Sequence, residues 1–92
     1  MTTIELQSRP RLPRGVKLRR DEARDRWTLL APERIFEVDA TAAAVLALCD
    51  GERDLATIVA DLAQRYRAPP DVIEKDVTAM LADLQAKRVV ET

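Results

Sequence analysis

The sequence contains no histidine and no asparagine, and serine and cysteine occur once each, as Ser8 and Cys49. Without histidine, neither a Ser-His-Asp nor a Cys-His catalytic arrangement can be assembled within the chain. The same absence, with a single thiol, disfavours a transition-metal site. The two glycines, Gly15 and Gly51, are far apart, so no glycine-rich phosphate-binding loop is present. We therefore expect no metal and no cofactor, and not an enzyme; acid–base work by paired carboxylates on one helix is the alternative that the residue inventory leaves open.

Aromatic residues and long apolar runs are also scarce. Trp27, Phe36 and Tyr66 are the only aromatic side chains, so the core must consist mainly of Leu, Val, Ile and Ala. The apolar fraction of 47% and the charged fraction of 34% are typical of a globular domain. No run approaches the ~20 apolar residues of a membrane-spanning helix, and the start lacks a signal-peptide pattern. A cytoplasmic location is expected, with Cys49 as a buried, reduced thiol.

The first fifteen residues alternate proline with charge and show no apolar periodicity. We interpret residues 1–15 as an extended N-terminal arm and residues 16–92 as one domain. The arm belongs to a basic region: residues 1–26 carry eight Lys or Arg against four Asp or Glu, whereas the remainder carries seven against twelve. Such asymmetry indicates either a basic arm for an anionic partner or a solvated hairpin face.

Alternating apolar residues predict three strands. The first begins at Val16, the second spans Trp27 to Leu30, and the third spans Arg34 to Asp39. A polar break at residues 20–25 and the Pro32-Glu33 pair separate them. The pattern predicts a three-stranded antiparallel meander.

Helical periodicity begins after Asp39. Asp39 or Thr41 is expected to cap a first helix that ends at Gly51, which tolerates a left-handed backbone. Asp54 is expected to cap a second helix, and Pro69-Pro70 ends it. The core-facing positions are Ala42, Val45, Leu46 and Cys49 in the first helix, and Leu55, Ile58, Val59, Leu62 and Tyr66 in the second.

Asp71 and Glu74 form a capping-box-like start for a third helix, and residues 89–91 follow it as a short extended piece. The core stripe of this helix consists of Ile73, Val77, Met80, Leu81 and Leu84. The element order predicts an α+β, winged-helix-like fold, in which a three-stranded antiparallel sheet precedes a three-helix bundle.

A winged helix often binds DNA through its third helix, so nucleic-acid binding is one alternative function. Here that helix carries acids at positions 71, 74, 76 and 83 against lysines at 75 and 87. An acidic helix loses the counterion-release contribution that dominates binding to phosphate backbones. The charge of the third helix therefore argues against this alternative.

Several short motifs together resemble pyrroloquinoline quinone (PQQ) biosynthesis protein D. These motifs are Pro10-x-x-Pro13-x-Gly15-Val16-x-Leu18, Leu29-Leu30-Ala31-Pro32-Glu33, Asp39-Ala40-Thr41-Ala42, Asp50-Gly51, Ile58-Val59, Asp76-Val77 and Leu81-x-x-Leu84. Each is weak alone, but their order and spacing cover nearly the whole chain. One departure is Lys87-Arg88, where the family pattern leads us to expect a glycine near the helix end.

The resemblance implies a peptide chaperone of the kind called a recognition element for ribosomally made, modified peptides. The implied partners are the precursor peptide of the quinone cofactor and a radical S-adenosylmethionine enzyme that crosslinks a Glu and a Tyr in that peptide. The iron–sulfur chemistry would belong to the enzyme. A catalytic role in quinone assembly and a scaffold that binds only the enzyme are the alternatives, and the sequence leaves monomer and homodimer open.

The expected peptide site combines the third strand with the third helix. If the third strand lies at a sheet edge, its backbone can pair with an extended peptide. The expected site residues are Arg34, Ile35, Phe36, Glu37 and Val38 on the strand, and Val72, Asp76, Ala79, Met80 and Asp83 on the helix. The two aspartates are expected either to bind a Lys or Arg of the peptide or only to solubilise an exposed face. Arg11, Arg14 and Arg19 are the expected contacts of the partner enzyme.

Overall fold

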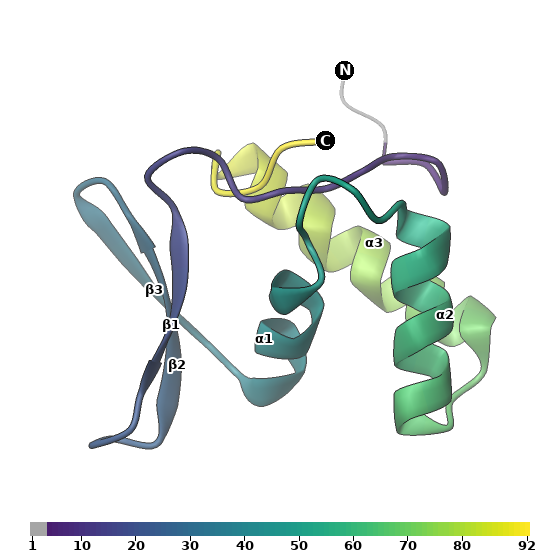
Figure 1. Ribbon diagram of the computed structural model, residues 1–92, viewed down its shortest axis with the longest axis horizontal. Coiled ribbons are helices and arrows are strands. Elements are labelled where there is room, and N and C mark those ends of the chain that lie inside the picture. The colour runs from purple at the N-terminus through teal and green to yellow at the C-terminus, as the bar shows by residue number, and fades with distance from the viewer. Residues whose placement is uncertain (1–3) are drawn as a thin grey trace.

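The computed structural model describes residues 4–92. Its strands are β1 (Lys17–Asp21), β2 (Arg26–Ala31) and β3 (Arg34–Val38), and its helices are α1 (Ala40–Ala47), α2 (Leu55–Tyr66) and α3 (Pro70–Ala86). The strands form one antiparallel sheet in the order β1-β2-β3, beside the three helices (Figure 1). The predicted α+β order of three strands and three helices is confirmed. Within residues 4–92, no helix is long and apolar enough to cross a membrane.

Only one face of the sheet is packed against the helices. Leu29, at the centre of β2, is fully buried and lies opposite Leu18 on β1 and Phe36 on β3. Because side chains alternate along a strand, the neighbouring Leu30 and Ile35 form a cross-strand pair on the outer face. Ile35 is accordingly 72% exposed.

Two of the predicted helix caps are confirmed. The Asp39 carboxylate accepts a hydrogen bond from the Ala42 amide at 2.7 Å, and the Asp54 carboxylate accepts one from the Thr57 amide at 2.8 Å. The hydrogen bonds from Thr57 hold the pKa of Asp54 below its usual value. These carboxylates satisfy amide donors that have no partner within the first helical turn.

Two predicted helix boundaries were wrong. The third helix begins at Pro70, with Pro69 as its N-cap and no side-chain cap, so Asp71 and Glu74 form no capping box. Proline suits the first helical position because its φ is preset and it lacks an amide that needs a partner. The first helix ends at Ala47 instead of continuing to Gly51, which lies in the following turn with φ of +79°. Cys49 is therefore outside α1, although it is buried as expected.

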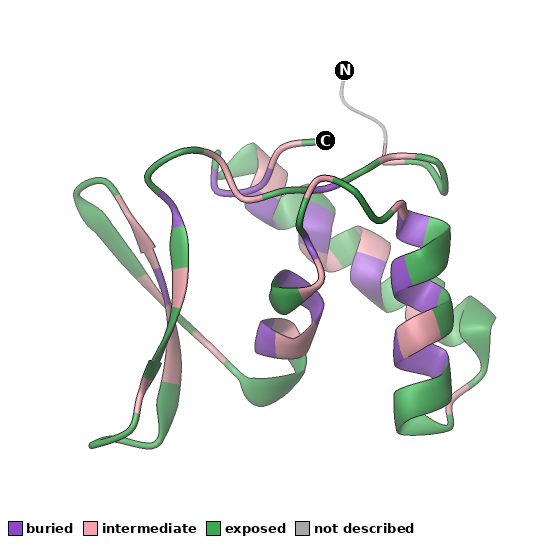
Figure 2. Cartoon of the chain, viewed as in Figure 1, coloured by how far each residue is buried: buried purple, intermediate pink, exposed green. Residues whose placement is uncertain are grey.

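The core lies between the helices and the inner face of the sheet (Figure 2). Its fully buried large side chains are Leu29, Leu46, Leu55, Ile58, Leu62, Leu81, Val89 and Val90. The last two reach the core because the chain turns back after α3, where the Val89 amide donates to the Leu84 carbonyl. Arg88 adopts φ of +64° in this turn. The arginine thus takes the left-handed conformation that a glycine would adopt more readily, so the turn keeps this geometry despite the departure from the family pattern.

Residues 4–15 contain no helix and lie along one side of the helices (Figure 1). Pro10 is fully buried, and Arg11 forms isolated antiparallel β-bridges with Asp50 and with Glu91. The carbonyls of Leu6 and Ser8 accept hydrogen bonds from the first amides of α2. Residues 1–3 of the predicted arm lie outside the described residues, and the division at residue 15 stays a prediction.

Candidate functional site

β3 forms one edge of the sheet, as the predicted peptide site requires. It pairs with β2 on one side and has no strand on its other side among residues 4–92. In an antiparallel sheet, every second residue of an edge strand directs its amide and carbonyl away from the neighbouring strand. β3 therefore presents a row of backbone groups that a further strand can pair with.

The side chains of β3 point to two different faces. Phe36 and Val38 are partly buried and pack on the core, whereas Ile35 and Glu37 lie on the outer face, where Glu37 forms a 2.7 Å ion pair with Arg26. The structure therefore separates the five predicted strand residues. The side chains of Ile35 and Glu37 face away from the helices, so these two residues can contribute only backbone groups to a site on the helical side of the sheet.

Arg34 links the start of β3 to the end of α3. Its guanidinium donates a 2.7 Å hydrogen bond to the Lys87 carbonyl and lies over the Phe36 ring, 5.3 Å from the centroid. A cation at this position satisfies a carbonyl at the negative end of the helix dipole. The two elements predicted to form the peptide site are thus joined at one end by a direct contact.

Four of the predicted α3 residues, Val72, Asp76, Ala79 and Asp83, are exposed. Val72 is 49% exposed and adds apolar surface to the outer side of α3. Asp83 forms a 2.9 Å ion pair with Lys87. Asp76 takes part in no ion pair within the described part of the chain, so its carboxylate is available to a ligand. Met80, the fifth residue, is partly buried against the core.

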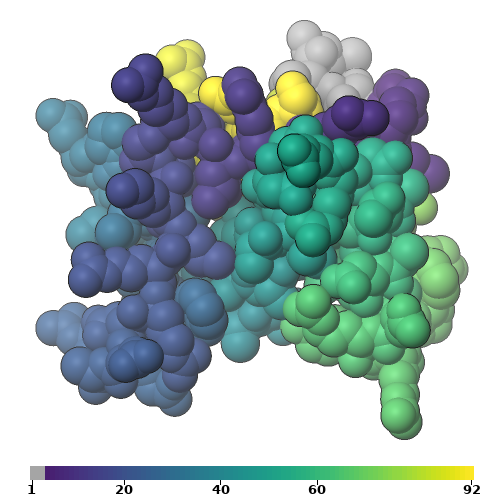
Figure 3. Space-filling view, viewed as in Figure 1, coloured from purple at the N-terminus to yellow at the C-terminus, as the bar shows by residue number. Residues whose placement is uncertain are grey.

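A cavity of about 100 Å³ lies between the three helices. The surface is hollowed between α1 and the C-terminal end of α2 (Figure 3). The cavity is lined by Thr41, Val45, Leu62, Tyr66, Ile73, Asp76, Val77 and Met80. Asp76 and Met80 were expected at the peptide site, whereas the α1 and α2 residues were missed. The side chains of these α1 and α2 residues carried no signal beyond ordinary helical periodicity.

Comparison with known proteins decides the family. Residues 26–90 match the family model described as coenzyme PQQ synthesis protein D (PqqD). The chain belongs to the PqqD family. The resemblance inferred from the sequence motifs is thereby confirmed.

Relatives of this PqqD-family chain share about half of its residues. It is 51% identical to a PqqA binding protein of Rhodopseudomonas palustris over 92% of this chain and 83% of that protein. It is 54% identical to the bifunctional coenzyme PQQ synthesis protein C/D of Methylorubrum extorquens over 89% of this chain, but it spans only 22% of that protein's length.

A solved structure has the same fold. The solution NMR structure of the PqqD truncation of Methylobacterium extorquens PqqCD has a TM-score of 0.86 and 49% identity, covering 99% of this chain and 97% of that chain. That truncation is described as a functional and stand-alone RiPP (ribosomally synthesized and post-translationally modified peptide) recognition element. The arrangement of sheet and helices is therefore common to both PqqD chains.

The three arginines predicted to contact an enzyme differ in their surroundings. Arg11 forms a 2.7 Å ion pair with Glu91, which locally neutralises its charge. Arg14 is exposed in the turn before β1, and Arg19 is exposed on the outer face of the sheet, opposite Thr28. In this PqqD-family chain all three arginines are exposed, and among them only Arg11 forms an ion pair within residues 4–92.

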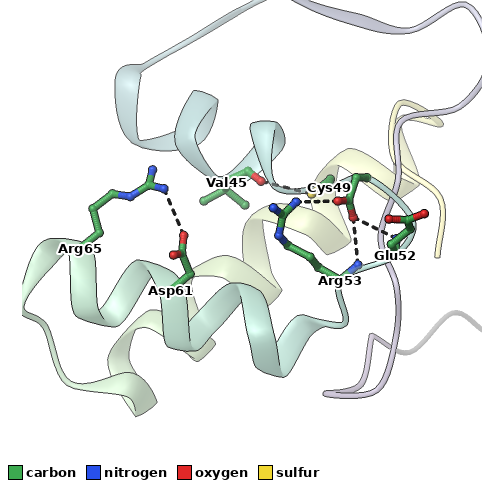
Figure 4. Close-up of polar contacts among 7 residues, drawn as sticks. Val45, Cys49, Glu52, Arg53, Asp61 and Arg65 are labelled. Atoms are coloured by element: carbon green, nitrogen blue, oxygen red, sulfur yellow. Dashed lines mark hydrogen bonds and ion pairs between the residues drawn. The ribbon is translucent and has the colours of Figure 1, made fainter.

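Cys49 of this PqqD-family chain is a buried structural thiol. Its Sγ donates to the Val45 carbonyl at 3.3 Å, and burial, reinforced by the negative charge of Asp50, raises its pKa to about 12. Figure 4 shows the thiol next to the turn that leads to Arg53. A thiol with so high a pKa carries almost no thiolate at neutral pH, which makes it a poor nucleophile.

Proposed function

We propose that this chain binds the PqqA precursor peptide and presents it to the radical S-adenosylmethionine enzyme of PQQ synthesis. The PqqA binding proteins among its relatives and the recognition element with the same fold support the peptide partner. The chain is then a binding module, and the chemistry belongs to the enzyme. The observation that carries the proposal is the open edge of β3 beside α3, with Arg34 joining the two elements.

The peptide adds to the sheet as a fourth strand along β3. The two-residue turn at Pro32-Glu33 brings Ala31 opposite Arg34, and a β-turn of this length normally has a hydrogen bond between these flanking residues. Hydrogen-bonded and non-hydrogen-bonded pairs alternate along an antiparallel sheet, so the amides and carbonyls of Ile35 and Glu37 point away from β2. These residues supply backbone hydrogen bonds, which give affinity with little dependence on the peptide's sequence.

Sequence selectivity comes from the exposed border of α3. Val72 and Ala79 offer apolar surface to the peptide, and Asp76 offers a carboxylate that lacks a basic partner in residues 4–92. A Lys or Arg of the peptide that reaches Asp76 forms a charge-assisted hydrogen bond, shielded from water by the peptide itself. Asp83 contributes less because Lys87 already pairs with it.

The partner enzyme meets the basic surface of the N-terminal half, where Arg14 and Arg19 are accessible. Charge attraction speeds the encounter with an acidic patch and weakens as salt screens it. Arg11 takes a smaller part because its guanidinium is bonded to Glu91.

Calorimetric titration of the isolated chain with synthetic precursor peptide tests the proposal. Saturable one-to-one binding in the absence of the enzyme is the expected result. A scaffold that binds only the enzyme gives no heat with peptide alone, and this outcome rejects the chaperone role.

A further inference from the structure

The cavity between the helices exists because α1 presents short side chains towards α3. Thr41 and Val45 are one turn apart, so both lie on the same face of α1. Both are β-branched and short, and neither fills the space in front of the buried Leu62 and Val77. The hollow is thus a consequence of which residues α1 carries, and larger residues at these two positions would close it.

The interior of the cavity is apolar, and its mouth is polar. Leu62 and Val77 are buried, whereas Tyr66 and Asp76 are exposed. No buried side-chain nitrogen or oxygen lacks a hydrogen-bond partner in residues 4–92. Water in a cavity needs two to four polar partners. The buried Leu62 and Val77 provide none, and the polar side chains of the lining, Thr41, Tyr66 and Asp76, lie at its exposed mouth. The hollow therefore suits an apolar group better than water.

The size of the cavity restricts that group. An apolar cavity of roughly 150 Å³ stays dry and accepts benzene. The present cavity, at about 100 Å³, is smaller. It has room for one side chain of about the size of Leu or Met.

The cavity is close to the strand that is expected to bind the peptide. Thr41 follows the last residue of β3, Val38, by three positions, so their Cα atoms are at most about 11 Å apart. Asp76 and Met80 belong both to the cavity lining and to the α3 wall of the peptide site. A peptide strand that continues past the end of β3 towards Thr41, an exposed residue of the cavity lining, therefore comes within reach of the cavity.

We propose that the cavity is an anchor pocket for one aliphatic side chain of the bound peptide, Leu, Ile, Val or Met. Asp76 at the mouth pairs with a Lys or Arg close to that side chain in the peptide sequence. This inference rests on the proposed function and adds to it a sequence requirement, an aliphatic residue next to a basic one. Tyr66, half-exposed at the rim, covers the inserted side chain.

Filling the cavity from within tests the inference. Thr41→Leu and Val45→Ile each extend into the hollow, and we expect each to weaken binding of the synthetic precursor peptide about tenfold, which corresponds to about 1.4 kcal/mol. Added apolar packing keeps the melting temperature at or above that of the wild type. A loss of affinity without a loss of stability separates an occluded pocket from a damaged fold. Val45→Ile is the more conservative change and keeps the test informative if Thr41→Leu misfolds.

Ala60→Leu is the matched control. Ala60 is exposed on α2 and lines a different, open groove, so the same kind of enlargement there leaves peptide affinity unchanged. Alanine replacement of each aliphatic residue of the peptide identifies the anchor. Replacing the anchor residue by alanine weakens peptide binding to the wild-type chain about tenfold. The same replacement has little further effect on peptide binding to the Thr41→Leu variant, as expected when two changes remove the same contact.

Three outcomes overturn the inference. Unchanged affinity in both cavity-filling variants, while Ile35→Pro loses affinity, rejects the anchor pocket and leaves the proposed function standing. An equal loss in Ala60→Leu shows that the effect is not specific to the cavity. A wild-type chain that does not bind the peptide rejects the proposed function, and the anchor pocket with it.

Discussion

Arg11 and Glu91 exchange both of their backbone hydrogen bonds, at 2.8 and 2.9 Å, and their side chains form an ion pair at 2.7 Å. This pairing joins the N-terminal segment to the chain that follows α3. The side chains are 63% and 46% exposed, so the ion pair itself contributes little to stability. The backbone pairing and the burial of Pro10 and Val90 on either side contribute more.

Deleting residues 1–11 should therefore cost far more stability than removing the ion pair. The deletion removes the Arg11–Glu91 pairing and the carbonyls of Leu6 and Ser8 that accept from the first amides of α2. At about 0.5–1.5 kcal/mol for each hydrogen bond, we expect the free energy of unfolding in urea to fall by at least about 2 kcal/mol. Glu91→Gln is the control, with an expected loss below about 1 kcal/mol. Equal losses would show that the side-chain charge holds the arm.

Arg88→Gly should stabilise the protein. Arg88 adopts φ of +64°, and the left-handed conformation costs a non-glycine residue roughly 1–2 kcal/mol. Glycine removes that cost but gains freedom in the unfolded chain, so the expected net gain is about 1 kcal/mol in urea unfolding. Arg88→Ala is the control that removes the side chain and keeps the strain. If both variants gain equally, the side chain and not the backbone is responsible.

Local patterns predicted most of the fold because they reflect local physics. Alternation located the three strands, and the carboxylates of Asp39 and Asp54 cap helices where the sequence places them. The wrong boundaries at Ala47 and Pro70 arose where competing residues were available, since Pro70 begins a helix more readily than Asp71 caps one.

The candidate site depended on contacts that no local pattern encodes. The predicted peptide site requires β3 to lie at an edge of the sheet. The strand order β1-β2-β3 places it there. The hydrogen bond from Arg34 to Lys87 joins residues 53 positions apart, and the cavity needs three helices to meet. Burial of the aliphatic stripes was predictable, but not the space that Thr41 and Val45 leave unfilled.

Ile35→Pro should weaken peptide binding by removing one backbone donor from the edge of β3. Proline is tolerated on an edge strand where its nitrogen faces outward, so the sheet should persist by circular dichroism. We expect an affinity loss of about 1 kcal/mol or more in calorimetric titration. Ile35→Thr is the matched control because it keeps the donor and a β-branched side chain on the outer face. A comparable loss in Ile35→Thr would shift the contact from the backbone to the outer side chain.

Asp76→Lys should reduce peptide affinity more than Asp83→Lys. Asp76 has no ion pair among the described residues, whereas Lys87 already pairs with Asp83. Reversing the charge at Asp76 replaces attraction of a peptide cation by repulsion, for an expected loss of about 1–2 kcal/mol at low salt. Asp71→Lys, in the first turn of α3, controls for the overall change in helix charge. Unaltered affinity in Asp76→Lys would leave both carboxylates as solvated surface groups.

Neutralising Arg14 and Arg19 together should slow association with the partner enzyme while leaving peptide affinity unchanged. Both side chains are exposed and belong to the basic N-terminal half of the chain. Long-range charge attraction acts mainly on the association rate. Stopped-flow mixing of the Gln double variant with the enzyme should give a lower rate constant at low ionic strength. The difference from wild type should disappear as salt shortens the screening length to below about 10 Å. Arg11→Gln is the matched control, since Arg11 is already paired with Glu91 and its loss should change the rate less. A double variant that associates at the wild-type rate at low salt would place the enzyme contact on another face of the molecule.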